Sequence, residues 1–148
     1  MAIAALITPG ICGAQGYTIT TVAAGGNGDS AGVALKLPLG LAVDADGNLY
    51  ITTGSSGNSF VVKVGPDGTV NAIVGSPTGF SGFSGDGGPA TSAQLGFNYL
   101  SPAGVAIDSA GNLFIADTGN SRVRKVSTNG VIMTYAGGGS VSNHSCPN

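Results

Sequence analysis

Short apolar runs separated by glycine-rich turns dominate the chain, and one arrangement of them occurs twice. Residues 38–53 read PLGLAVDADGNLYITT, and residues 102–117 read PAGVAIDSAGNLFIAD. The two stretches start 64 residues apart (102 − 38 = 64) and place apolar, polar and glycine residues at matching positions. A repeat of this kind indicates a modular architecture in which each copy is one supersecondary unit.

Each copy predicts four short strands. The expected strands are 41–44, 49–52, 60–64 and 70–74 in the first copy, and 105–108, 113–116, 122–126 and 131–136 in the second. The turns between them contain glycine and asparagine, which tolerate positive φ. No stretch of ten residues repeats apolar positions at the helical spacing i, i+3, i+4. The sequence therefore predicts an all-β fold of four-stranded antiparallel sheets.

The predicted strands are apolar on both faces. In the first copy Leu49 and Ile51 point to one side of the strand and Tyr50 to the other, and the second copy repeats this pattern. A β-sandwich would leave one face of each sheet polar. Sheets that are covered on both sides favour stacking of neighbouring sheets, as in the blades of a β-propeller.

A partial third copy precedes the two full ones. Residues 17–26, YTITTVAAGG, are similar to the end of the second copy, VIMTYAGGG. We therefore expect two full blades plus one extra strand. The expected division is a propeller segment at 17–139, with a blade strand at 17–26 and blades at 38–75 and 102–139, followed by a disordered tail at 140–148.

The first 16 residues, MAIAALITPGICGAQG, are apolar and then small, which is typical of a secretory signal and its cleavage region. They predict a secreted or periplasmic bacterial protein, although the positive residues that usually begin a signal are missing. The alternative is a disordered arm. Cleavage near residue 15 would remove Cys12 and leave Cys146 without an intramolecular disulfide partner. The apolar run is too short to span a membrane.

Composition agrees with glycine turns between buried strands. Glycine supplies 27 of the 148 residues, more than twice its usual share of about 7%. Charged residues make up 8% of the chain, and the formal net charge is −2. Five lysines and arginines form no basic stripe for phosphate contacts, so nucleic acid is not an expected partner.

The second copy resembles an NHL repeat. The resemblance lies in PAGVAIDSAGNLFIADTGNSRVRKVSTNGVIMTYAG, residues 102–137, where GVAID, GNLFIADTGNSRV and KV…NGVI occur in order. The segment FSGDGGPATSAQL, residues 83–95, is similar to the connection between blades in secreted bacterial NHL propellers. The resemblance implies part of a six-bladed β-propeller that works as a binding or interaction platform.

The first copy departs from the NHL pattern, with Thr53 in place of Asp117 and Phe60 in place of Arg122. Two blades and one strand do not close a six-bladed ring. We expect a segment of a longer chain with further blades, which is the favoured hypothesis, a homo-oligomeric ring of three copies (3 × 2 = 6), or a short open array. The extra leading strand argues against simple closure by three copies, and an open array would expose apolar faces and strand edges.

The connection between the copies, residues 76–101, is the favoured binding surface, because a connection of this length is often functional. Its ligand is expected to be a protein or a carbohydrate. The alternative is that its aromatic rings pack beneath the connection and seal the adjacent blades. The candidate binding residues are Phe80, Phe83, Asp86, Phe97 and Tyr99.

A second polar group is expected where the second strand of the second copy turns into the third. Asp117 and Arg122 are predicted to pair across this tight turn, with the side chain of Asn120 holding the turn. The functional hypothesis is a polar contact on the connection side. The favoured hypothesis is a structural polar cluster that stabilises the blade.

Catalytic and metal sites find little support in the sequence. Residues 44–48, DADGN, resemble the opening of a calcium loop, but the chain has no glutamate, so a hairpin turn is expected instead. The single histidine is His144, in the patternless tail. No catalytic residue, metal or cofactor is therefore expected, and the chain is predicted to be a non-catalytic scaffold. The alternative is part of a lactonase-like or lyase-like propeller enzyme whose catalytic residues lie in other blades.

Overall fold

The computed structural model describes residues 35, 37–55, 57–76, 79–98, 100 and 103–138. Several expected features lie outside these residues, and they stay predictions: the signal at 1–16, the strand at 17–26, the tail at 140–148, Tyr99, His144 and both cysteines. Within the described part, no helix is long and apolar enough to cross a membrane.

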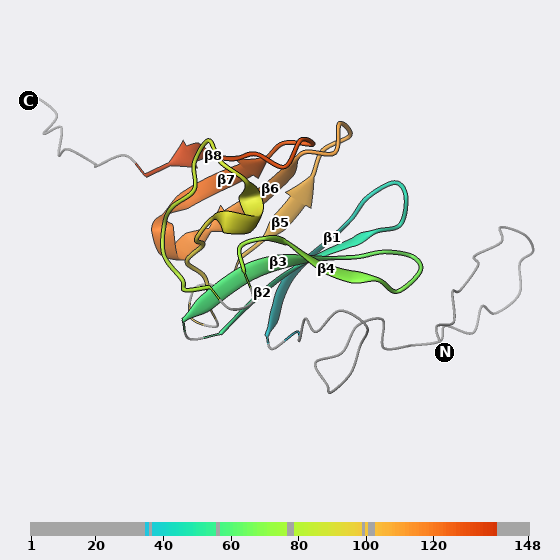
Figure 1. The fold of residues 1–148 in the computed structure, drawn as a ribbon, viewed down its shortest axis with the longest axis horizontal. Coiled ribbons are helices and arrows are strands. Elements are labelled where there is room, and N and C mark those ends of the chain that lie inside the picture. Colours follow the sequence, from blue (N-terminus) through green and yellow to red (C-terminus); the bar gives the residue numbers. More distant parts are fainter. Residues whose placement is uncertain are drawn as a thin grey trace, which may run out of the picture.

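The described residues form two twisted four-stranded sheets, one from each copy of the repeat (Figure 1). In both sheets each strand pairs antiparallel with the next strand along the chain. The expected all-β fold is confirmed. The first sheet contains β1 (Pro38–Val43), β2 (Leu49–Ser55), β3 (Asn58–Val64) and β4 (Val70–Val74), and the second contains β5 (Val105–Ile107), β6 (Leu113–Asp117), β7 (Arg122–Val126) and β8 (Ile132–Gly137).

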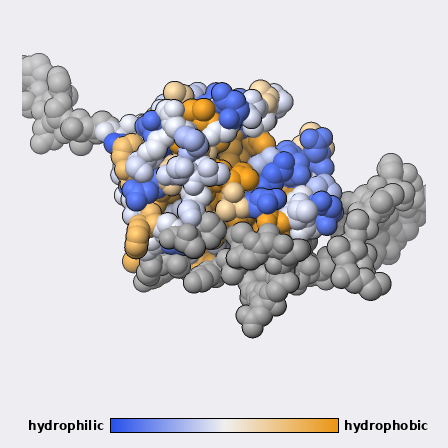
Figure 2. All heavy atoms as spheres, in the orientation of Figure 1, coloured by the Kyte–Doolittle hydropathy of each residue, from blue (hydrophilic) through white to orange (hydrophobic). Residues whose placement is uncertain are grey.

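Hydrophilic residues gather at the hairpin ends of the first sheet, on the right of Figure 2. At the β1–β2 turn the Asp44 carboxylate accepts hydrogen bonds from the backbone of Asp46 and Asn48, and from the Asn48 side chain at 2.7 Å. Gly47 has a φ of +82°, which a residue with a side chain rarely adopts. The DADGN segment is therefore a hairpin turn closed by its own aspartate.

The Tyr50 hydroxyl donates a hydrogen bond of 3.0 Å to this same carboxylate. Burial raises the pKa of Tyr50 to about 12, and the neighbouring Asp44 charge and hydrogen bond add to the effect. Burial opposes ionisation of Asp44, but hydrogen bonds from Asn48 and Tyr50 outweigh it and hold the pKa of Asp44 below its ordinary value.

Replacing Asp44 with alanine is expected to lower the pKa of Tyr50 from about 12 toward 10.0, because the acceptor and its negative charge are removed while burial remains. Ring-carbon NMR shifts of Tyr50, followed against pH, measure this change. Asp108→Ala is the matched control, because the equivalent aspartate is followed six residues later by Phe114 instead of a tyrosine. A Tyr50 pKa that is the same in wild type and Asp44→Ala would refute the coupling.

The larger of the two buried cores lies between the sheets. It contains one face of the first sheet, one face of the second, and side chains of the connection between them. Its buried members are Tyr50, Val61, Val74, Ala90, Ala93, Leu95, Phe97, Ala103, Leu113, Ile115, Val126 and Ile132. Burial of each large aliphatic side chain contributes about 1.5–3 kcal/mol, so this core is the main attraction between the sheets.

The two sheets approach most closely at their first strands, β1 and β5 (Figure 1). Thr52 donates its hydroxyl to the carbonyl of Ala103 at 2.8 Å, which ties β2 to the start of the second unit. Gly40 lies so close to the Ala103 carbonyl that a side chain at position 40 would overlap it. A glycine is therefore required at this point of contact.

The opposite face of the first sheet is also buried, around Phe60, Val62 and Val64, which explains why its strands are apolar on both sides. The opposite face of the second sheet is more open. There Met133 and Tyr135 are exposed, and Tyr135 packs edge-on against Phe114 with ring centres 5.1 Å apart.

Candidate functional site

The connection between the sheets follows a definite path across the second sheet (Figure 1). The backbone N–H of Gly87 donates to the carbonyl of Ile132 at 2.8 Å, and that of Ala90 donates to Gly130 at 2.8 Å. A short 3₁₀ helix, η1 (Ala90–Ser92), follows, and the N–H of Gly75 at the end of β4 donates to Ala90 at 2.9 Å. These bonds fix the connection to both sheets.

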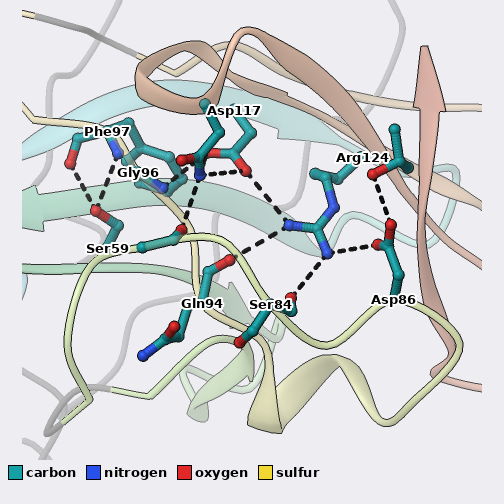
Figure 3. A network of polar contacts seen from close by, with 11 residues as sticks. Ser59, Ser84, Asp86, Gln94, Gly96, Phe97, Asp117 and Arg124 are labelled. Carbon is teal, nitrogen blue, oxygen red and sulfur yellow. Dashed lines mark hydrogen bonds and ion pairs between the residues drawn. The ribbon is translucent and has the colours of Figure 1, made fainter. Parts of the chain in front are cut away.

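Arg124, on β7, is the centre of a polar network under the connection (Figure 3). Its side chain is fully buried, and Nη2 donates to Asp86 at 2.7 Å and to the Ser84 carbonyl at 3.0 Å. Nη1 donates to the Gln94 carbonyl at 3.3 Å and to Asp117 at 3.4 Å. Since three of these four acceptors belong to the connection, Arg124 clamps the connection to the second sheet.

Asp117, at the end of β6, is the fully buried carboxylate of the same network. It accepts a hydrogen bond of 2.7 Å from the backbone N–H of Gly96. Asn120, in the 3₁₀ helix η2 (Thr118–Asn120), donates its side-chain amide to Asp117 at 2.9 Å and to the Gly82 carbonyl at 2.7 Å. Asp117 and Asn120 are thus brought together, and both also hold the connection.

The expected pairing of Asp117 with Arg122 is wrong, because Arg124 is the arginine that contacts Asp117. Although Arg122 lies opposite Asp117 in the β6–β7 register, its guanidinium carbon stacks 3.9 Å from the centre of the Phe83 ring. The carboxylate oxygens of Asp117 are already engaged by Gly96, Asn120 and Arg124.

Arg124 itself was not among the candidate residues, although the sequence holds a signal for it. The first copy has Val62 at the equivalent position, and Val62 lies fully buried in the apolar core. A charge that replaces a core valine in a repeat needs buried partners. Those partners are on the connection, whose path the repeat does not predict.

The carboxylate of Asp86, on the connection, accepts hydrogen bonds from the Arg124 guanidinium and from the hydroxyl of Thr134 on β8, each at 2.7 Å. Burial alone would raise the pKa of Asp86, but the hydrogen bond from Thr134 and the charge of Arg124 outweigh it and lower the pKa below its ordinary value. Its side chain is still 40% exposed. The carboxylate therefore binds Arg124 and is at the same time partly exposed to solvent.

The aromatic residues of the connection divide into two groups. Phe97 is buried between the sheets, where its backbone makes two hydrogen bonds to the Ser59 hydroxyl, at 2.6 and 3.1 Å. Phe80 is 80% exposed and Phe83 is 43% exposed. Phe97 thus seals the sheets, as the packing hypothesis expected, whereas Phe80 and Phe83 lie on the surface.

Groups of three or more His, Cys, Asp or Glu side chains that would hold a metal ion do not occur in the part of the chain that the structure describes. The carboxylates near the connection, Asp86 and Asp117, are bound to an arginine. Through these two ion pairs Arg124 joins the connection to β6 of the second sheet.

Two consecutive four-stranded antiparallel sheets that stack face to face, with their first strands adjacent, define the chain as a segment of the β-propeller class. Residues 99–126 match the family model of the NHL repeat, so the resemblance of the second copy to this repeat is confirmed.

One similar protein is SUPPRESSOR OF QUENCHING 1, chloroplastic, of Arabidopsis thaliana, which is 38% identical over 103 residues. The match covers 70% of this chain and 9% of that protein, so the chain spans about a tenth of its length.

Solved structures with a similar arrangement include virginiamycin B lyase from Staphylococcus aureus, with a TM-score of 0.44 and 15% identity, covering 67% of this chain and 26% of that one. The structure of a streptogramin B lyase gives a TM-score of 0.42 and 14% identity, and the match covers 66% of this chain and 26% of that one.

Proposed function

We propose that this propeller segment is a non-catalytic binding scaffold whose partner is a protein. The proposed contact surface is formed by the exposed rings of Phe80 and Phe83 on the connection, and we call it the Phe80–Phe83 surface. The observation that carries the proposal is that two exposed aromatic side chains flank Ser81 and Gly82, and hydrogen bonds hold the backbone of both of these residues.

The hydrogen bonds that hold this backbone come from both copies of the repeat and from the connection itself. The N–H of Ser81 donates to the Gly57 carbonyl of the first unit at 2.8 Å. The N–H of Gly82 donates to Leu95 at 3.0 Å, and its carbonyl accepts from Asn120 of the second unit at 2.7 Å. Aromatic anchors on a fixed backbone lose little conformational entropy on binding. Large aromatic residues also supply much of the binding energy at protein interfaces.

The charged groups of this region support a scaffold role over a catalytic one. A general base needs a carboxylate or imidazole that is free to take up a proton from a substrate. Asp117 is fully buried and hydrogen-bonded on both oxygens, and Asp86 is held by Arg124 and Thr134. These carboxylates therefore act within the protein.

Selection of a random peptide display library on the immobilised protein tests the proposal. Wild type is expected to enrich peptides whose binding falls at least tenfold in the double variant Phe80→Ala/Phe83→Ala, because the proposed anchors are removed. Met133→Ala is the matched control, since Met133 is also exposed but lies on the far face of the second sheet. Failure to enrich any peptide, or equal binding by wild type and the double variant, would overturn the proposal.

A further inference from the structure

Arg122 stands at the edge of the Phe80–Phe83 surface and is the second arginine of β7 to contact Phe83. Its guanidinium carbon lies 3.9 Å from the ring centre, so the two planar groups form one amphipathic platform. Nη2 makes a long hydrogen bond of 3.4 Å to the Gly138 carbonyl. This contact is weak for a charged donor.

The other guanidinium nitrogens of Arg122 are unsatisfied. Nε and Nη1 are shielded from solvent and have no hydrogen-bond partner within the described part of the chain. A buried donor without an acceptor is costly, and native structures usually supply one. Arg122 therefore has two donors that neither bulk water nor a described residue satisfies.

The charges around Arg122 do not supply this acceptor. Asp86 and Asp117 are both directed at Arg124, which has an ion pair with each. Of the four charged side chains in this region, Arg122 is the one that makes no ion pair within the described residues. Among the described residues, Arg122 therefore lacks a negatively charged acceptor.

We propose that Arg122 and Phe83 together bind the carboxylate of an acidic peptide, from an aspartate or glutamate side chain or from a chain end. This rests on the proposed binding function and names the chemistry of the partner. A guanidinium offers parallel N–H donors that match the two oxygens of a carboxylate, and each parallel pair joins Nη2 to Nε or to Nη1. In Arg122 the carboxylate would therefore share Nη2, whose bond to Gly138 is long, and would satisfy one of the two unpartnered donors. The exposed Phe83 ring supplies an apolar contact for the residue that carries it.

The site lies beside the end of β8, and its arginine is specific to the second blade. Gly138, which lies against the Arg122 guanidinium, is itself exposed, so a small shift of this residue admits an acceptor to Nη1. In the first blade the equivalent position holds Phe60, which is buried in the apolar core. A nucleic acid would require several unpaired cations, whereas this surface offers one.

Side-chain NMR of the full chain tests the proposal directly, because Arg122 and Arg124 are the only two arginines. The probes are the peptide acetyl-Gly-Phe-Gly-Asp-Gly-amide, its neutral counterpart with asparagine in place of aspartate, and acetyl-Gly-Phe-Gly with a free carboxyl end. We expect the Nε–H signal of Arg122 to move with an acidic probe and to stay with the neutral one. The two acidic probes distinguish a side-chain from a terminal carboxylate.

Substitutions separate this proposal from the more general one. Arg122→Gln is expected to weaken the acidic peptide at least tenfold, whereas Lys125→Gln, on the opposite face, leaves its affinity unchanged. Arg122→Phe, which copies the first blade, is a second variant in case Arg122→Gln folds poorly, and it should lose the acidic peptide as well. Equal affinity for acidic and neutral peptides, no binding of either acidic probe, or unchanged acidic binding in both Arg122 variants overturns the proposal. Retained binding of display-selected peptides through Phe80 and Phe83 would leave the general function standing in that case.

Discussion

Replacing Arg124 with methionine is expected to lower the free energy of unfolding by about 3–5 kcal/mol. The substitution leaves the buried Asp117 carboxylate without its cation and removes the donors that hold Ser84, Asp86 and Gln94. Breaking a buried ion pair from one side costs this much because the remaining charge stays desolvated. Denaturant unfolding at pH 7, followed by circular dichroism, measures the change.

Lys125→Met is the matched control for this prediction. Lys125 is the next residue of β7, so its side chain points to the opposite face of the sheet, where its ammonium lies 5.6 Å from the centre of the Phe114 ring. Its loss is expected to cost about 0.5–1 kcal/mol, typical of an exposed cation–π contact. If Arg124→Met and Lys125→Met destabilise the protein equally, Arg124 is not the clamp.

The second large effect is expected at the contact between the sheets. Gly40→Ala should lower the free energy of unfolding by about 2–3 kcal/mol, because the new methyl group would overlap the Ala103 carbonyl and press on Thr52. The overlapped oxygen belongs to the backbone of Ala103, so a change of side-chain rotamer does not relieve the contact. Thermal and denaturant unfolding of the purified variant measure the loss.

The repeat itself supplies the control. Gly104 is the equivalent glycine of the second copy, but a methyl group there would lie 3.9 Å from the Ala116 side chain, at an ordinary contact distance. Gly104→Ala is therefore expected to change stability by less than about 1 kcal/mol, with a small gain from the stiffer unfolded chain. Equal losses in the two variants would show that the stacking of the sheets does not limit position 40.

Much of this fold follows from local sequence patterns. The alternation of Leu49, Tyr50 and Ile51 predicts a strand with two apolar faces, and both faces are occupied by buried clusters in the first sheet. The DADGN turn is predicted from its glycine and asparagine, which tolerate positive φ, and Gly47 has a φ of +82° in the structure. These features depend on a few neighbouring residues, which is why the sequence is sufficient.

The candidate site was less predictable, because it depends on where the connection lies. The sequence predicts a structural polar cluster of Asp117, Asn120 and Arg122, but the choice of Arg124 over Arg122 depends on carbonyls of Ser84 and Gln94, which are 40 and 30 residues away. Spacing along the sequence favours Arg122 as the partner of Asp117, because Arg122 is closer to the turn. The repeat offers no template for the connection, since it occurs once between the two described sheets.

Differences between the copies gain a physical meaning from the structure. The first copy has Thr53 and Val62 where the second has Asp117 and Arg124, and all four side chains are fully buried. Val62 belongs to an apolar core, whereas Arg124 faces the polar backbone of the connection. The second copy therefore uses charge at these positions because a segment rich in carbonyl acceptors covers that face.

Residues 79–98 form a fixed surface that is built into the fold. Amide hydrogen exchange of the wild-type protein tests it most directly, because Gly82, Gly87, Ala90, Gly96 and Phe97 donate backbone hydrogen bonds. We expect these amides to exchange within about tenfold of the rates of the β7 amides, and we expect Arg124→Met to accelerate exchange of the Gly82 and Gly96 amides selectively. Exchange of these amides in wild type at the rate of an unstructured peptide would show that residues 79–98 are not held in a fixed arrangement.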